Sequence, residues 1–350
     1  MLSRVVIKNF KSIGEPGVDL DLKPLTLLVG PNGSGKSSIL EAIAVASQRN
    51  ISGELVSFPT RMSIRHLLNG SSMTIETHFA LAEKLGLRYL INSPGPIERK
   101  FLLDSSETTH PEVQARVISH AEKLETNAFL ISSLRGDIRY HVGTSASPKW
   151  VGVRGQHLLL LLAIIFGDRR HRMIADKIRT WAGRYGIGDL FAGLRGDDQV
   201  GSDYIDTEIK ATLDLALASS GSKQILTVIT QLFWAPEGSL LMIEEPEISL
   251  HPKAQIDVLE MFAEAIREDN KQIIATTHST FLLQALGYAV LKGWLTPDQI
   301  AVYHVEKGQA GTTASLLPLD EKGNLTDWVP SFTEVERRLM REWAKTLPRK

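Results

Sequence analysis

Residues 30–37 read Gly-Pro-Asn-Gly-Ser-Gly-Lys-Ser, a full match to the phosphate-loop pattern G-x-x-x-x-G-K-[ST]. An apolar, strand-like run, Leu25–Val29, precedes the loop, and an apolar, helix-like segment at 38–46 follows it. A phosphate loop needs a strand before it and a helix after it, so the pattern lies in a suitable context. The sequence therefore predicts an α/β fold of the P-loop class.

The residue types of the loop predict that it binds a nucleoside triphosphate with Mg²⁺. Its glycines let backbone N–H groups turn toward phosphate oxygens, and the following helix adds its positive end. Lys36 is expected to contact the β- and γ-phosphates, and Ser37 to offer its hydroxyl to Mg²⁺. The expected nucleotide-binding residues here are Asn32, Gly33, Ser34, Gly35, Lys36, Ser37 and Ser38.

Length and composition indicate an ordinary soluble chain. Its 350 residues are 43% hydrophobic and 23% charged, enough for one large or two ordinary domains with a substantial core. The longest apolar run, at 158–166, is too short to cross a bilayer, and no signal-peptide pattern is present. We therefore expect a cytoplasmic protein with no membrane partner. The absence of Cys excludes disulfides, thiolate zinc sites and cysteine nucleophiles.

Charge gives no overall attraction to nucleic acid, because the formal net charge is −1. Two local basic clusters remain, at 169–184 and at 337–350. The first holds Arg169, Arg170, Arg172, Lys177, Arg179 and Arg184, and the second holds Arg337, Arg338, Arg341, Lys345, Arg349 and Lys350. Each cluster is either a solvated helix face or a contact to a nucleic-acid phosphate backbone.

Changes of pattern along the chain predict its organisation. Short alternating runs within 50–140, separated by Asn-Gly and Pro-Gly turns, predict antiparallel sheet. Residues 155–218 look mostly helical and carry no sustained heptad pattern, and α/β character returns from 221. The expected strands lie at 5–10, 25–29, 73–79, 87–91, 97–103, 240–243 and 272–276.

The end of the chain predicts one more helix. Ser331 and Glu334 form a capping box, and the apolar residues Val335, Leu339, Trp343 and Leu347 then recur every four positions, so this helix should dock by one face. The expected division is a first part of the core at 1–49, an antiparallel β lobe at 50–150, a helical lobe at 151–220, a second part of the core at 221–305, and an extension with the docking helix at 306–350.

Two acids end the apolar strand at 240–243. Glu244 is expected to hold the metal, directly or through water, and Glu245 to orient and deprotonate the attacking water. Adjacent strand residues point to opposite faces, so the two acids can share a site only if the strand ends there, and Pro246 ends it. The next strand ends in His278, which can donate to a γ-phosphate.

The ordered set of phosphate loop, S-S-G-S-K-Q at 219–224, I-E-E-P-E-I-S-L-H-P at 243–252 and A-T-T-H-S at 275–279 resembles the ATP-binding-cassette (ABC) ATPases. Within them it is most similar to the SMC/RecF-like and overcoming-lysogenization-defect (OLD)-like branch of AAA-type ATP-binding proteins. The opening I-K-N-F-K-S at 7–12 resembles the first strand of that branch, and Glu247 and Gln255 also match. The likeness is strong at 1–47 and 218–283.

This resemblance implies an ABC-type ATPase head, with an antiparallel β lobe and a helical lobe, that hydrolyses ATP. It implies that Ser219 and Gly221 form a signature loop that reaches the partner's γ-phosphate in a head-to-tail homodimer. It also implies that Glu245 is the catalytic base and that His278 is the switch histidine. Neither coiled-coil arms nor a nuclease domain is expected, because no heptad run or second acidic cluster is present.

Several residues differ from the family pattern. Ser220 replaces a common Gly, and His251 lies where the dimer-facing loop often has Asp. No clear Q-loop Gln exists, and Arg135, in the segment at 129–138 that resembles the Q loop, is expected to bind the nucleotide in its place.

The leading expectation for function is ATP hydrolysis coupled to closing and opening of the dimer, in DNA maintenance or anti-phage defence, with DNA as a partner. A second hypothesis is a nucleotide-switched scaffold that recruits a separate effector protein such as a nuclease. A transporter ATPase subunit is a third, which the Asn-Phe-Lys-Ser opening at 9–12 and the Pro246-Glu247 continuation disfavour.

Overall fold

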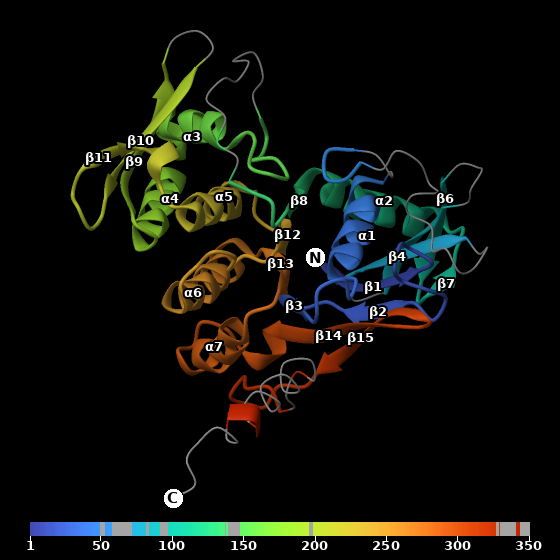
Figure 1. Cartoon of the computed structure of the whole chain (residues 1–350). Helices are drawn as coiled ribbons and strands as arrows, with labels where there is room; N and C mark the ends of the chain where they lie inside the picture. Colours follow the sequence, from blue (N-terminus) through green and yellow to red (C-terminus); the bar gives the residue numbers. More distant parts are fainter. Residues whose placement is uncertain are drawn as a thin grey trace, which may run out of the picture.

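The computed structural model describes residues 1–49, 53–57, 72–81, 84–91, 97–136, 138, 148–195, 199–326, 329 and 341–343. Its helices are α1 (Lys36–Gln48), α2 (Pro111–Asn127), α3 (Leu158–Gly167), α4 (Arg172–Arg184), α5 (Ser220–Trp234), α6 (Pro252–Asp269) and α7 (Thr280–Leu291). The strands form three separate sheets, which Figure 1 shows as a central core with a lobe on either side.

The core sheet has the strand order β15-β14-β3-β13-β12-β8. Its strands are β3 (Leu25–Val29), β8 (Ala128–Ile131), β12 (Leu240–Glu244), β13 (Gln272–Thr277), β14 (Ile300–Gly308) and β15 (Gly311–Leu317). All neighbours run parallel except β15, which pairs antiparallel with β14. In Figure 1, α1 lies on one side of this sheet and α6 and α7 lie on the other.

The central strands explain why the sequence forms a parallel sheet. Every residue of β3 and of β13 is buried, so these strands, apart from Gln272 at the start of β13, are continuous runs of apolar or small residues without alternation. The expected strands at 240–243 and 272–276 are confirmed. Helix α6 begins at Pro252, where the missing N–H costs nothing, and ends before Asn270, which takes a left-handed φ of 49°.

The second sheet is antiparallel, in the order β2-β1-β4-β5-β6-β7. Its strands are β1 (Leu2–Lys8), β2 (Val18–Asp21), β4 (Met73–Phe79), β5 (Leu85–Ile91), β6 (Ile97–Leu103) and β7 (Ser106–Glu107). The antiparallel sheet expected within 50–140 is confirmed. The first two strands of the chain belong to it rather than to the core sheet, and α2 packs on β5 and β6.

The remaining lobe corrects one expectation. Helices α3 and α4 confirm helical structure at 158–184, but residues 187–214 form a three-stranded antiparallel sheet where mostly helix was expected. Its strands are β9 (Ile187–Leu194), β10 (Val200–Asp206) and β11 (Thr212–Asp214), in the order β11-β10-β9. The glycines at 188, 193 and 201 lie within these strands.

Two further expectations concern the ends and faces of the chain. The helix expected from Ser331 onward lies mostly outside the described residues. Within that segment the structure describes residues 341–343, which are helical. Among the described helices, none combines the length and the apolar character that crossing a membrane requires.

Candidate active site

The candidate site lies where β3, β12 and β13 end. Parallel strands end at the same edge of a sheet, so the phosphate loop after β3, the acids after β12 and His278 after β13 come together there. The phosphate loop, Glu245 and His278 line one pocket of about 240 Å³. Its lining residues are Ser12, Asn32, Gly33, Gly35, Lys36, Ser37, Ser38, Glu245, Thr276 and His278.

Glycines allow the phosphate loop to adopt its shape. Gly30 has a φ of 154° and Gly35 a φ of 109°, and a Cβ on either would collide with its surroundings. On Gly35 that atom would lie 2.2 Å from Thr312 Oγ1, whereas a Cβ on Gly33 would meet nothing within 4 Å. Gly35 therefore allows close packing at the back of the loop, while Gly33 faces open space.

Lys36 is poised inside the loop. Its Nζ donates to Gly30 O and Pro31 O, each at 2.9 Å. Burial lowers the pKa of this ammonium, and Glu245 and Glu244 partly oppose that effect. The ammonium therefore shares the pocket with the carboxylate of Glu245, and the negative charge of a bound phosphate would compensate it.

A polar cluster supports the loop from behind. Thr312 Oγ1, on β15, donates to Ser34 O at 2.8 Å and lies 2.8 Å from Ser12 Oγ. Ser12 Oγ in turn donates to Ser38 Oγ at 3.1 Å. Sequence reasoning missed Ser12 and Thr312, because isolated hydroxyl residues carry no pattern that would link them to a loop far away in the chain.

The turn after β12 separates the roles of the two acids. Glu244 is the last residue of the strand, and its Oε2 accepts from Ser132 Oγ at 3.2 Å and from Ser133 N–H at 3.1 Å. Glu245 has a φ of 44°, which takes it out of strand geometry. Its backbone N–H donates to Thr276 O and Oγ1, and its carboxylate lines the pocket that Glu244 does not line.

His278 faces Glu245 across the pocket. Its Nε2 lies 3.9 Å from Glu245 Oε1. Burial is the main cause that lowers the pKa of His278, with nearby Lys36 acting in the same direction and Glu245 against it. The imidazole is therefore neutral at neutral pH and has one N–H to donate.

Arg135 requires a correction. It does not line the pocket, and its guanidinium donates to five backbone carbonyl oxygens instead. These belong to Ser132 (3.2 Å), Gln224 (3.2 Å), Glu244 (2.6 Å), Glu245 (2.8 Å) and Pro246 (3.2 Å). A guanidinium has five N–H donors, so none remains for a phosphate. The expectation that Arg135 contacts the nucleotide does not hold in this structure.

A family model described as "AAA domain, putative AbiEii toxin, Type IV TA system" matches residues 25–284, which span the phosphate loop, the two acids and His278. The chain belongs to this AAA-domain family. Among curated proteins, the OLD nuclease of Thermus scotoductus is 54% identical to this AAA domain over 43 residues. That match covers 12% of the chain and 8% of the OLD nuclease.

Solved structures agree with the fold. An SMC head bound to the C-terminal winged-helix domain of ScpA has a TM-score of 0.63 at 15% identity, covering 91% of this chain and 98% of that chain. A Pyrococcus furiosus-derived SMC head with an extended coiled coil, bound to the C-terminal domain of ScpA, has a TM-score of 0.57 at 13% identity, covering 98% of this chain and 99% of that chain. The AAA domain is thus a P-loop ATPase with the fold of an SMC head.

Ser219 and Gly221, which the resemblance assigns to a signature loop, do not line the phosphate pocket of their own chain. Ser219 is exposed and caps α5, since its Oγ accepts from Ser222 N–H at 3.0 Å. Gly221 is buried, and a Cβ there would lie 2.5 Å from Ser249 O. His251 caps α6 by accepting from Lys253 N–H at 3.3 Å, which is the local role that an Asp would have.

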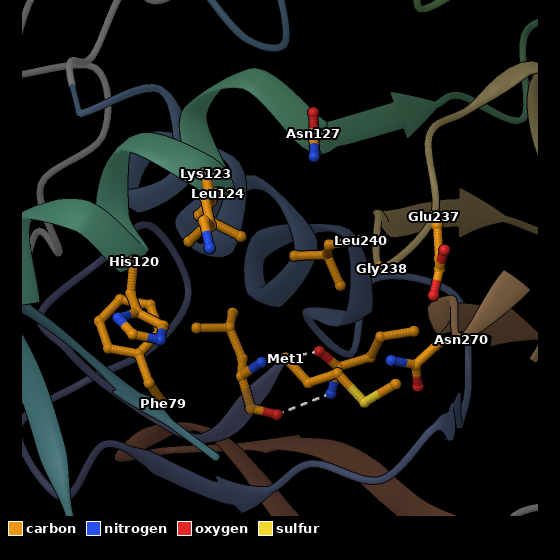
Figure 2. Close-up of a pocket in the computed structure, with 12 residues that line it drawn as sticks. Met1, Phe79, His120, Lys123, Leu124, Asn127, Glu237, Gly238, Leu240 and Asn270 are labelled. Atoms are coloured by element: carbon orange, nitrogen blue, oxygen red, sulfur yellow. Dashed lines mark hydrogen bonds between the residues drawn. The ribbon is translucent and has the colours of Figure 1, made fainter. Parts of the chain in front are cut away.

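A second pocket lies at the opposite edge of the core sheet, near the first residues of β12 and β13. Figure 2 shows Phe79 and His120 on one side of it and Glu237 and Asn270 on the other. Gln272 binds the backbone of Leu2 there, with bonds of 2.9 and 2.7 Å. Since the phosphate loop follows the other end of β3, this pocket is separate from the candidate active site.

Proposed function

We propose that the AAA domain hydrolyses ATP in a head-to-tail homodimer that closes with ATP and opens after hydrolysis. The observation that carries this proposal is the single pocket in which Lys36, Ser37, Glu245 and His278 meet. An ammonium group, a hydroxyl, a carboxylate and a neutral imidazole around one pocket are the groups that phosphoryl transfer to water requires.

Each side chain has a definite task in this proposal. Lys36 donates hydrogen bonds to the β- and γ-phosphates, in place of its bonds to the loop carbonyls or in addition to them. Glu245 accepts the proton of the attacking water. Neutral His278 donates to the γ-phosphate. Mg²⁺ suits the oxygen donors Ser37 and Glu244, and it would neutralise charge on the phosphates.

Exposure around the signature loop supports the dimer. Ser219 lies on the surface and away from the pocket of its own chain, so it is free to reach the pocket of a second copy. Leu217, directly before the loop, is 70% exposed, and Leu134 beside Arg135 is 71% exposed. Large exposed apolar side chains commonly mark a surface that a partner covers.

For the biological role we propose DNA maintenance or anti-phage defence in the cytoplasm, with DNA as a partner. The support is the local match to an OLD nuclease and the family description, which names a toxin of a toxin–antitoxin system. The alternative is a nucleotide-switched scaffold that recruits a separate effector protein. The SMC heads bound to ScpA domains favour it, because heads of this fold can bind a second protein.

Glu245→Gln tests the proposed cycle. The amide keeps the shape of Glu245 but cannot accept a proton, so hydrolysis should fall about 10²–10⁴-fold while ATP still binds. Light scattering should then show a dimer with ATP and a smaller species with ADP or without nucleotide. Lys36→Ala is the control, because it should lose tight ATP binding and show no ATP-dependent dimer. If the Glu245→Gln variant has the same mass with ATP, with ADP and without nucleotide, the dimer cycle is refuted.

A further inference from the structure

Arg135 links three parts of the fold that the candidate site depends on. It follows β8, and its side chain reaches the end of β12 and the first turns of α5. The residue is 5% exposed. Its five hydrogen bonds, at 2.6–3.2 Å, all end on backbone carbonyls and therefore fix the path of the chain rather than a side chain.

The charge of this buried guanidinium is maintained. Burial lowers its pKa to about 10, and the carboxylates of Glu247, Glu245 and Glu244 oppose that shift. A pKa of about 10 keeps Arg135 protonated at neutral pH, so all five donors persist. Charged donors make stronger hydrogen bonds than neutral ones, and five of them form a stiff connection.

One end of this connection is the turn that carries Glu245. Three consecutive carbonyls, from Glu244 to Pro246, accept from Arg135. The turn needs such bonds, because Glu245 has a φ of 44°, a conformation that non-glycine residues adopt at a cost. Thr276 holds the N–H side of Glu245 and Arg135 holds its carbonyl, so the direction of the carboxylate depends on both.

The other end is the helix of the signature loop. Gln224, which accepts from Arg135 Nε, lies in the first turns of α5, and that helix starts beside Ser219 and Gly221. The adjacent Gly136 packs closely here, since a Cβ on it would lie 3.1 Å from Gln224 Cγ. A shift of the signature loop along α5 would therefore act on Arg135 directly.

We propose that Arg135 is a positioning residue that couples the signature loop to the orientation of Glu245. Engagement of the loop by a partner's ATP fixes α5, and Arg135 transmits this to the carbonyls on either side of Glu245. The base is then held in place for hydrolysis only when the partner subunit is engaged. This inference rests on the proposed ATP-driven dimer. It adds that, within each subunit, the state of the signature loop controls the orientation of Glu245 in the same subunit.

Arg135→Lys tests the coupling, because it keeps the charge but places its donors on a single nitrogen that cannot span five carbonyls. We expect kcat for ATP to fall about tenfold to a hundredfold, with KM within about twofold of wild type. Arg184→Lys is the matched control on α4, where Arg184 pairs with Glu260 and Asp257, and it should keep kcat. Wild-type kcat in Arg135→Lys would overturn the coupling. A wild-type protein without ATPase activity would instead refute the proposed function.

A double-mutant cycle separates positioning from a structural role. If Arg135 acts through Glu245, then adding Arg135→Lys to Glu245→Gln should lower the residual rate by less than about twofold. A structural defect would multiply with the loss of the base. A further loss of about tenfold or more in the double variant would therefore overturn the proposal.

Hydrogen exchange gives a second test if Arg135→Lys does not fold. At saturating ATP, amides at 244–248 should be more protected in wild type than in Ser219→Arg, whose larger side chain blocks the signature loop from the partner. Equal protection of these amides in the two proteins would overturn the coupling, because the turn would then be independent of the loop.

Discussion

Glu247 is a buried carboxylate beside the candidate site, and only one of its two oxygens is hydrogen-bonded. Oε1 accepts from Thr277 Oγ1 and from His278 N–H at 3.2 Å, whereas Oε2 is buried without a partner. The side chain thereby fixes the backbone at His278. Burial raises the pKa of Glu247 above its usual value of 4.5, so this position costs stability once the unfolded chain ionises.

Glu247→Gln should change the pH dependence of folding. As pH rises above about 4.5, the unfolded chain releases the Glu247 proton while the folded protein retains it up to its raised pKa. Rising pH therefore lowers the free energy of unfolding of wild type relative to the variant through this window. Urea unfolding at about four pH values between 4.5 and 8 gives the free energy of unfolding of each protein, and so measures the difference.

Glu237→Gln is the control for this experiment, because Glu237 is an exposed carboxylate. It should leave the pH dependence of unfolding unchanged. A difference between wild type and Glu247→Gln that stays constant with pH would contradict the interpretation of Glu247.

At the scale of elements, the β14–β15 hairpin contributes to the nucleotide site although no motif lies on it. Strand β14 pairs with β3 from Ile300 to His304, and β15 places Thr312 behind the phosphate loop. Thr312 is 2% exposed. Removing its hydroxyl would leave the buried Ser34 carbonyl without this donor.

Thr312→Val keeps the shape of the side chain and removes the hydroxyl. We expect it to lower the free energy of unfolding by about 1–3 kcal/mol and to weaken ATP binding several-fold, because the loop loses its support. Thr313→Val, on the other face of the same strand, is the matched control and should do neither. Calorimetry with ATP and thermal unfolding measure both effects. Equal ATP affinity in the two variants would show that β15 does not support the loop.

Elements with a local signature were predictable, and those held by distant backbone groups were not. The strands around the phosphate loop and the acids have continuous apolar runs that end in polar residues, so their ends could be read directly. Strands β9 to β11 pair only with one another, and the burial along β9 does not alternate, so no period of two indicated a strand there. The role of Arg135 depends on carbonyl oxygens, which every residue has, so side-chain types could not reveal it.

At the scale of the whole molecule, the basic cluster at 169–184 bears on the question of DNA binding, and most of its members already have acidic partners. In the cluster at 169–184, Arg184 pairs with Glu260, Lys177 with Glu268 and Arg170 with Asp168. The pairs of Arg184 and Lys177 connect the helical lobe to α6, and the pair of Arg170 is local, so little unpaired positive charge remains on this face. A solvated, ion-paired helix face therefore describes this cluster better than a surface for nucleic-acid phosphates.

We expect nucleotide-free protein to bind duplex DNA weakly through this face, with a shallow dependence on salt. Binding isotherms between about 50 and 200 mM salt give the slope, and six phosphate contacts would produce a slope of roughly −5. A slope that steep would mean that these ion pairs open on DNA and would contradict the expectation. ATPase stimulation by DNA would favour a DNA role, and its absence would favour the scaffold.

The order of strands in the core sheet also governs how the chain is made. The phosphate loop leaves the ribosome early, yet β3 lies between β13 and β14, and Thr312 reaches the loop only after β15 has been synthesised. Until β13 has been synthesised, the apolar strand β3 has neither of its neighbours, and bound ATP cannot stabilise the nascent chain. A ribosome that stalls before residue 272 would therefore release a fragment with an intact phosphate-loop motif but without His278 and the strand beside β3, a substrate for chaperones and proteases.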